Sequence, residues 1–279
     1  MCDVAPFYFD PEKLLSLARQ KREQYQSAKP FPHIVLDQFI SEEVLQEALR
    51  EFPSIEELAH WKIASDENTQ YRKFHLPDTS EMKFHVRHLV EQFNSSTFCL
   101  FLEELTGIEG IIPDPHLLGG GIHQIARGGL LKVHADFNVH HRFRLDRRLN
   151  VLLYLNPDWK EEYGGHLELW DEEMSRWVQK ILPTFARCVI FNTTSSSYHG
   201  HPDPLDCPDS MTRKSLAFYY YTNGRPESER QPKHAVLFQQ RPNERDLRPL
   251  ALAKRAVKQV MPPIAVDAFR FLERKFFRA

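Results

Sequence analysis

His134 and Asp136 place an imidazole and a carboxylate two residues apart in the stretch LLKVHADF, residues 130–137. The stretch is otherwise apolar and strand-like, and residues i and i+2 of a strand point to the same face of a sheet. The two side chains are therefore expected to project together, where they could bind one metal ion. We expect the third ligand at His199, which follows an apolar run and a polar turn in FNTTSSSYHGHP, residues 191–202.

Two histidines and one carboxylate on one side of a metal ion leave the opposite side open. This arrangement is typical of non-haem Fe(II) sites that bind a cosubstrate and O2. Other histidines are rival candidates: His201 has the same strand parity as His199, and His140 and His141 lie in an arginine-rich loop. The four cysteines are scattered and form no C-x-x-C pair, so a structural zinc site is not expected.

Arg213 and Ser215 share a face if the run RKSLAFYYYT, residues 213–222, is a strand. An arginine and a hydroxyl on one inward face can bind a carboxylate, the arginine through two hydrogen bonds. A buried arginine also needs such an anion. A dicarboxylic cosubstrate would meet the metal ion at one end and Arg213 at the other. Lys214 is the alternative cation, but the strand parity relative to Ser215 favours Arg213.

The elements that must position these residues change in character near Pro113. Before it, amphipathic patterns and capping signals predict helices over about 10–28, 41–51 and 80–107, with a strand within residues 31–41. After it, short β-branched or aromatic runs separated by Gly, Pro, Asn and Asp predict an all-β sandwich or barrel. The runs cover residues 119–127, 129–137, 148–156, 164–171, 177–194 and 213–222.

Composition excludes some classes of function. A chain of 279 residues is long enough to bury a sizeable core, and its net charge of −2 gives no reason to expect nucleic-acid binding. No apolar run approaches the length of a membrane span, and the N-terminus MCDVAPFYFDPEK lacks the basic start and apolar centre of a signal peptide. We therefore expect a cytoplasmic protein.

The order of short motifs H-A-D, Y-L-N, G-G, F-N-T, H-G and R-x-S resembles the Fe(II)/2-oxoglutarate-dependent oxygenases, in particular their prolyl 4-hydroxylase-like branch. The most similar stretch is VLLYLNPDWKEEYGGHLELW, residues 151–170, and the likeness spans roughly residues 30–240. The resemblance implies that His134, Asp136 and His199 bind iron. It also implies cosubstrate-binding residues, which are Arg213, Tyr154, Ser215 and, ten residues before His134, Gln124.

The same resemblance implies a single α+β domain over residues 1–279, built on a double-stranded β-helix, which is a jelly-roll or cupin-like barrel. The expected parts are a helical part (1–112), a jelly-roll core (113–222) and a tail (223–279) with helices over 247–261 and 265–279. The tail should pack on the domain, since isolated helices of that length are marginally stable.

The implied activity is a dioxygenase that uses Fe(II), 2-oxoglutarate and O2, with ascorbate as a stimulant. It would hydroxylate an unactivated C–H bond and release succinate and CO2, although desaturation or ring closure would need the same cofactors. Four arginines in one loop, Arg142, Arg144, Arg147 and Arg148, favour an anionic small-molecule or carrier-linked substrate. A prolyl residue of a protein or peptide is the alternative. A metal-dependent hydrolase and a non-catalytic jelly-roll binding protein are further alternatives, and neither would consume 2-oxoglutarate.

Overall fold

The computed structural model describes residues 7–57, 60–66, 68–242 and 244. All elements named below belong to the compact unit Met1–Pro242. The helices expected over 247–261 and 265–279 lie outside the described residues. The C-terminal limit of the predicted single domain lies outside them as well. None of the helices in the described part of the chain is long and apolar enough to cross a membrane, and the cytoplasmic location stays a prediction.

The N-terminal helices are α1 (Pro11–Ser27), α2 (Glu42–Arg50), α3 (Phe84–Phe93) and α4 (Ser96–Thr106). Helix α1 begins as expected, because the Asp10 carboxylate accepts a hydrogen bond from the Lys13 amide and Pro11 occupies the first turn.

The prediction of a single helix over 80–107 is wrong, because the helical segment is interrupted at Asn94 and Ser95, between α3 and α4. The Ser95 hydroxyl accepts a hydrogen bond from the Phe98 amide and so caps a new helix, α4. Gly107, in the left-handed conformation, ends α4 where the sequence predicted an end.

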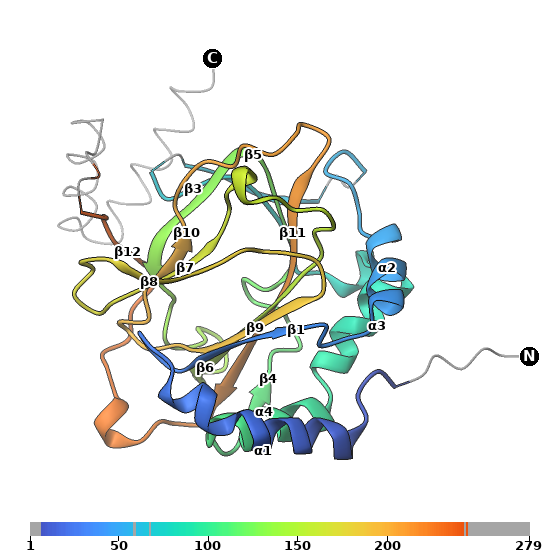
Figure 1. Ribbon diagram of the computed structural model, residues 1–279. Helices are drawn as coiled ribbons and strands as arrows, with labels where there is room; N and C mark the ends of the chain where they lie inside the picture. Colours follow the sequence, from blue (N-terminus) through green and yellow to red (C-terminus); the bar gives the residue numbers. More distant parts are fainter. Residues whose placement is uncertain (1–6, 58–59, 67, 243, 245–279) are drawn as a thin grey trace, which may run out of the picture. The chain divides into compact units, whose positions relative to one another are not determined.

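The strands form a curled antiparallel sheet in the order β1-β9-β6-β11-β5-β10-β7-β8 (Figure 1). Side chains of these strands line a cavity. Pairs outside this path are β2 with β3, β3 with β5, β4 with β11, and β12 with β5. The bounds are β1 (His33–Asp37), β2 (Lys62–Asp66), β3 (Gln70–Leu76), β4 (Ile112–Pro113), β5 (Gly121–Ala135), β6 (Asp146–Tyr154), β7 (Leu167–Trp170), β8 (Trp177–Ile181), β9 (Arg187–Asn192), β10 (His199–His201), β11 (Thr212–Thr222) and β12 (Leu237–Phe238).

Strand β5 is one long strand where the sequence predicted two. Its first half, residues 121–126, pairs with β11, whereas Leu131 and His134 in its second half pair with β10. Gly129 lies where β3 comes close, since a Cβ there would lie 2.9 Å from the carbonyl oxygen of Tyr71. One strand therefore contributes to both halves of the curled sheet.

The hairpin of β2 and β3 was not expected, because the first 112 residues were predicted to be mainly helical. Strand β3 pairs with β2 on one edge and with β5 on the other, in the register Lys73 with Ile125 and His75 with His123. The hairpin therefore adds a wall to the β5 side of the cavity.

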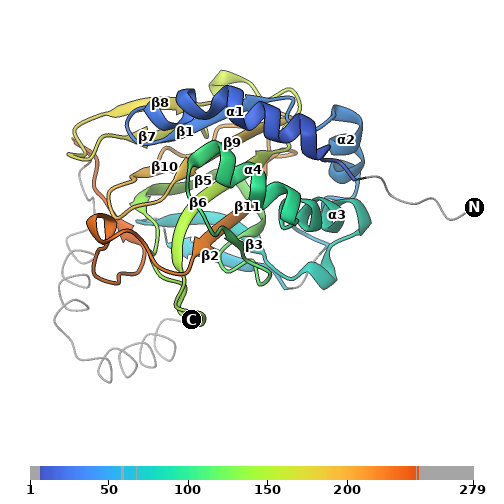
Figure 2. The same ribbon diagram turned by 90° about the horizontal axis from the view of Figure 1, so that it is seen from below.

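Successive side chains of a strand point alternately toward the helices and toward the cavity. On β11, Phe218 and Tyr220 pack outward on the helices, and the ring of Phe218 stacks on Phe93 of α3 at a centroid distance of 4.5 Å. Figure 2 shows the four helices gathered on one side of β6, β9 and β11. Arg213 and Ser215, which have the opposite parity, line the cavity.

Candidate metal centre and its cavity

Two neighbouring strands bring the three predicted metal ligands together. His134 lies near the end of β5, Asp136 follows it, and His199 begins β10 directly opposite His134. The His134 Nε2 atom lies 3.6 Å from Asp136 Oδ1, and the His199 Nε2 atom lies 3.5 Å from Asp136 Oδ2. The potential ligand atoms all lie within 4.8 Å of one another, so one metal ion could meet all three.

Backbone carbonyls fix the orientation of both imidazole rings. The Nδ1 atom of His134 lies 2.9 Å from the carbonyl oxygen of Lys132, and that of His199 lies 2.9 Å from the carbonyl oxygen of Ser197. A carbonyl oxygen can only accept, so each Nδ1 donates and the neutral ring keeps its lone pair on Nε2. Burial lowers the pKa of His199 to about 4, which favours that neutral form. Such partners are typical of metal-binding histidines.

Asp136 is held as a carboxylate by two buried donors. Its Oδ2 atom accepts hydrogen bonds from the Arg147 guanidinium at 2.9 Å and from the Asn150 amide at 2.8 Å. Burial acts to raise the pKa of Asp136, but Arg147 and the two histidines outweigh it and hold the pKa well below its usual range. The guanidinium also lies 3.5 Å above the ring of Tyr219. The carboxylate can therefore supply a negative charge to a metal ion.

The expectation that Arg142, Arg144, Arg147 and Arg148 share one basic loop is wrong for the last two, which lie buried in strand β6. Arg147 is buried beside Asp136, and Arg148 is buried and paired with Glu229 at 3.0 Å. Arg142 and Arg144 are exposed and lie outside the residues that line the cavity. The β6 strand begins at Asp146, earlier than expected, and draws the last two arginines into the sheet.

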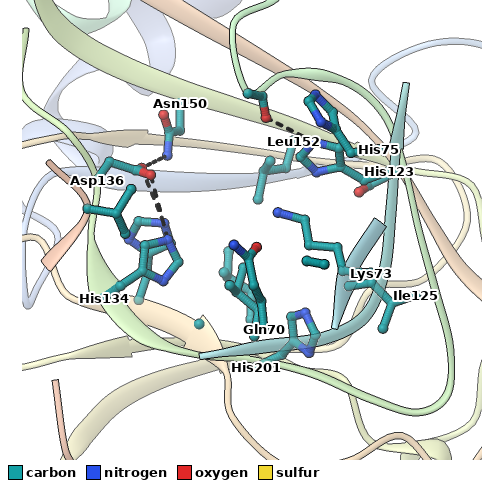
Figure 3. A pocket seen from close by; sticks show the side chains of 18 of the residues that line it. Gln70, Lys73, His75, His123, Ile125, His134, Asp136, Asn150, Leu152 and His201 are labelled. Carbon is teal, nitrogen blue, oxygen red and sulfur yellow. Dashed lines mark hydrogen bonds and ion pairs between the residues drawn. The ribbon is translucent and has the colours of Figure 1, made fainter. Parts of the chain in front are cut away.

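The cavity beside the three ligands has a volume of about 360 Å³, within the range of small-molecule sites. Figure 3 shows His134 and Asp136 on one side of it, His75 and His123 on another, and Lys73 directed into its middle. The lining residues come from β2, β3, β5, β6, β7, β10 and β11, from Gly119, Asp136 and Phe137, and from Val236 and Phe238 in the segment that ends in β12.

Arg213 lies buried in this cavity with uncharged partners. Its Nε atom donates to the carbonyl oxygen of Gly165 at 2.7 Å, and a terminal nitrogen donates to the Tyr154 hydroxyl at 3.2 Å. Burial raises the pKa of Tyr154, with Arg213 acting in the opposite direction, so the phenol keeps its proton. No carboxylate of the described residues pairs with Arg213. Ser215 lines the cavity two residues further along the same strand face.

Gln124 does not line the cavity, which corrects the expectation that it binds the cosubstrate. Its amide donates to the carbonyl oxygen of Pro53 at 2.6 Å and accepts from the Thr212 hydroxyl at 2.8 Å. Its neighbours His123 and Ile125 line the cavity instead, because adjacent strand residues point to opposite faces.

The rival ligands lie apart from the three-residue cluster. His201 lines the cavity, but the described ligand cluster contains His199 and not His201. His140 lies 3.9 Å from Asp114 and does not line the cavity. Lys214, the alternative to Arg213, donates to the Thr212 hydroxyl outside the cavity.

Comparison with known proteins agrees with this geometry. Residues 120–221 match the family model of the 2OG-Fe(II) oxygenase superfamily. A prolyl 3-hydroxylase of Mus musculus, OGFOD1, is 28% identical over 79 residues, which cover 27% of this chain and 14% of that relative's length. The resemblance expected from the sequence motifs is confirmed.

Two solved structures share the fold. A prolyl hydroxylase from Trichoplax adhaerens, in complex with a peptide of a hypoxia inducible factor, is 18% identical with a TM-score of 0.57, over 75% of this chain and 91% of that one. The carbocyclase SnoK from nogalamycin biosynthesis is 9% identical with a TM-score of 0.51, over 73% of this chain and 83% of that one. The predicted double-stranded β-helix is confirmed.

Proposed function

Because residues 120–221 match the family model of the 2OG-Fe(II) oxygenase superfamily, we propose that this chain is an Fe(II)- and 2-oxoglutarate-dependent dioxygenase. One observation carries the proposal: a single cavity is lined by two complementary groups of residues. The first group is two imidazoles and a carboxylate, and the second contains a buried guanidinium with no carboxylate partner among the described residues. A ligand with a chelating keto acid at one end and a carboxylate at the other matches both.

The donor set of the first group suits Fe(II). His134 and His199 would each bind through Nε2, and Asp136 would contribute the negative charge from the same side. When bound, the iron supplies the O2 chemistry that hydroxylates an unactivated C–H bond while 2-oxoglutarate leaves as succinate and CO2. The protein orients the reacting groups and excludes water from them.

Arg213, Tyr154 and Ser215 would bind the far carboxylate of the cosubstrate. The Tyr154 oxygen accepts a hydrogen bond from Arg213, so its own proton is available for the carboxylate. The guanidinium has donors beyond those used for Gly165 and Tyr154, and a charged pair inside a cavity is stronger than one in water.

The proposed substrate is a small or carrier-linked molecule, which a cavity of this size can accept beside the cosubstrate. The second candidate is a prolyl residue of a protein or peptide, favoured by the sequence similarity to the mouse prolyl 3-hydroxylase. A screen that measures succinate release with small metabolites and with prolyl peptides would separate them.

The test of the metal site uses the weak visible charge-transfer band of an anaerobic Fe(II)–2-oxoglutarate complex. We expect the wild-type chain to give this band, because the triad can chelate the metal while Arg213 holds the cosubstrate. His199→Ala should abolish the band, whereas His201→Ala should keep it, because only His199 belongs to the ligand cluster.

The reverse pattern in these two variants would make His201 the third ligand and overturn the assignment. A wild-type protein that binds Zn(II) but neither shows the band nor releases succinate would support a hydrolase in place of the oxygenase.

A further inference from the structure

Lys73 is a cavity residue that the proposed reaction does not use. It lies on β3 and pairs in register with Ile125 of β5, which in turn pairs with Arg213 of β11. The three residues therefore form one row across three strands. Figure 3 shows the Lys73 amine directed into the cavity, while the adjacent Arg72 is exposed and does not line the cavity.

Lys73 has no anionic partner among the charged residues that line the cavity. The charged lining residues are Lys62, Lys73, Arg147, Arg213 and Asp136. Arg147 is paired with Asp136, Arg213 would be paired with the far carboxylate of 2-oxoglutarate, and Lys62 is exposed to solvent. The remaining carboxylate of the cosubstrate would bind the metal ion. Lys73 alone keeps an unmatched positive charge inside the cavity.

An unmatched ammonium group in a cavity is unfavourable unless a ligand supplies the partner. Lys73 makes no hydrogen bond or ion pair with the described residues. Burial lowers the pKa of Lys73 to about 8, with Asp136 acting in the opposite direction, so the amine is still largely protonated at neutral pH. A bound anion would restore the usual preference for the charged form.

His201 gives an independent sign of a missing polar ligand. It is 3% exposed, it lines the cavity, and neither of its ring nitrogens has a hydrogen-bond partner among the described residues. Buried polar atoms are rarely left unsatisfied, and such atoms often belong to binding sites. Gln70 of β3 and His201 of β10 both pair with Leu131 of β5, so these three residues form a second row across three strands.

We propose that Lys73, together with His201 and Gln70, binds a carboxylate or phosphate group of the substrate, so that the enzyme acts on an anionic substrate. This proposal rests on the proposed function, because it takes Arg213 and the metal ion as the partners of 2-oxoglutarate. Lys73 would then determine substrate specificity, since a neutral analogue would leave its charge unmatched.

The first test measures anion binding directly. Lysines are labelled by reductive methylation with ¹³C-formaldehyde, which keeps their charge, and the NMR signal of Lys73 is assigned by its loss in Lys73→Met. The protein is loaded with Zn(II) and 2-oxoglutarate, and inorganic phosphate is then titrated in. We expect the Lys73 signal to shift saturably with phosphate, while the signal assigned through Lys214→Met stays fixed, because Lys214 lies outside the cavity and donates to the Thr212 hydroxyl.

Two results of this titration would overturn the proposal. A Lys73 signal that shifts fully with 2-oxoglutarate and not with phosphate would assign the lysine to the cosubstrate. A signal that responds to neither would mean that Lys73 binds no anion.

The second test measures turnover. Pairs of candidate compounds that differ only by a free acid or its amide are screened for stimulation of succinate release. We expect the acids to stimulate the wild type at least tenfold more than the amides. Lys73→Met should lose this preference, Lys73→Arg should recover part of it, and Lys214→Met should keep it, because Lys214 lies outside the cavity.

The anaerobic Fe(II)–2-oxoglutarate band separates failure of this proposal from failure of the proposed function. We expect Lys73→Met to give the band with a 2-oxoglutarate Kd within twofold of wild type. If the wild type gave no band, the oxygenase assignment itself would fall. A normal band with equal stimulation by acids and amides would refute the role of Lys73 alone.

Discussion

Asn150 connects the two charged groups beside the candidate metal centre. Its side-chain oxygen accepts two hydrogen bonds from Arg147, at 3.1 and 2.7 Å, and its amide nitrogen donates to Asp136. The residue is buried and lines the cavity. It therefore holds the carboxylate in place from outside the ligand set, as is typical of residues around metal sites.

We expect Asn150→Ala to weaken metal binding about 10- to 100-fold, because Asp136 and Arg147 lose their shared partner. Competition with a chelator for Zn(II) measures the Kd. Asn156→Ala is the matched control, since Asn156 is equally buried but bonds to the backbone of Pro183 and Lys214. It should lower stability and leave the metal Kd nearly unchanged. Equal metal affinity in Asn150→Ala and wild type would contradict the role of Asn150.

At the scale of elements, β5 decides which side chains enter the cavity. The segment from Leu131 to His134 of β5 pairs with the shorter segment from His199 to His201 of β10. Strand β5 therefore carries one extra residue, a β-bulge, between Leu131 and His134. Such a bulge reverses the side-chain parity of a strand. His134 and Gln124 have the same parity in the sequence, yet only His134 faces the cavity. Strand parity counted from His134 would also place Gln124 in the cavity, and the bulge, which the local composition does not predict, turns Gln124 away from it.

The turn before β7 is a second element that shapes the site. Gly164 and Gly165 both have positive φ, at +68° and +72°. A Cβ on Gly165 would lie 2.6 Å from Leu205 and 3.0 Å from Arg213, whereas a Cβ on Gly164 would meet nothing within 4 Å. Gly164 is thus required only for its backbone conformation. Gly165 is required for its conformation and also because a side chain there would contact Arg213.

We expect Gly165→Ala to raise the Kd for 2-oxoglutarate at least tenfold, because the new methyl group displaces Arg213. Gly164→Ala should cost about 1–3 kcal/mol of stability, because its backbone, at φ +68° and ψ −148°, lies in a region that is essentially restricted to glycine, but it should bind 2-oxoglutarate like the wild type. The anaerobic titration of the visible band measures both constants. If the two variants bound 2-oxoglutarate equally, the contact with Arg213 would not matter.

At the scale of the whole molecule, the sequence predicted the helical start, the jelly-roll core and the gathering of His134, Asp136 and His199. Strand parity and the order of motifs carried that information. The β2–β3 hairpin was missed because its residues, KIASD and QYRKFHL, show no clear apolar alternation. Lys73 was missed with it, since its position depends on pairing between segments far apart in the chain.

Ligand binding to the folded chain should stabilise the whole molecule. Zn(II) and 2-oxoglutarate, each at about 100 times its Kd, should each add about 2.7 kcal/mol, because neither site exists in the unfolded chain. Scanning calorimetry should show a rise in Tm for the metal and a further rise for 2-oxoglutarate. Arg213→Leu should keep the first rise and lose the second. A full second rise in that variant would remove Arg213 from the cosubstrate site.

The hydrogen bonds from His134 and His199 to backbone carbonyls also bear on entropy. Each ring is fixed by an acceptor two residues earlier in its own segment, so its side-chain freedom is lost when the sheet forms. The two side chains then lose little further rotational entropy when a metal ion binds, and this raises the affinity of the site for the ion. The same bonds oppose collapse of the two rings onto Asp136, which keeps the three ligand groups apart and ready to receive an ion.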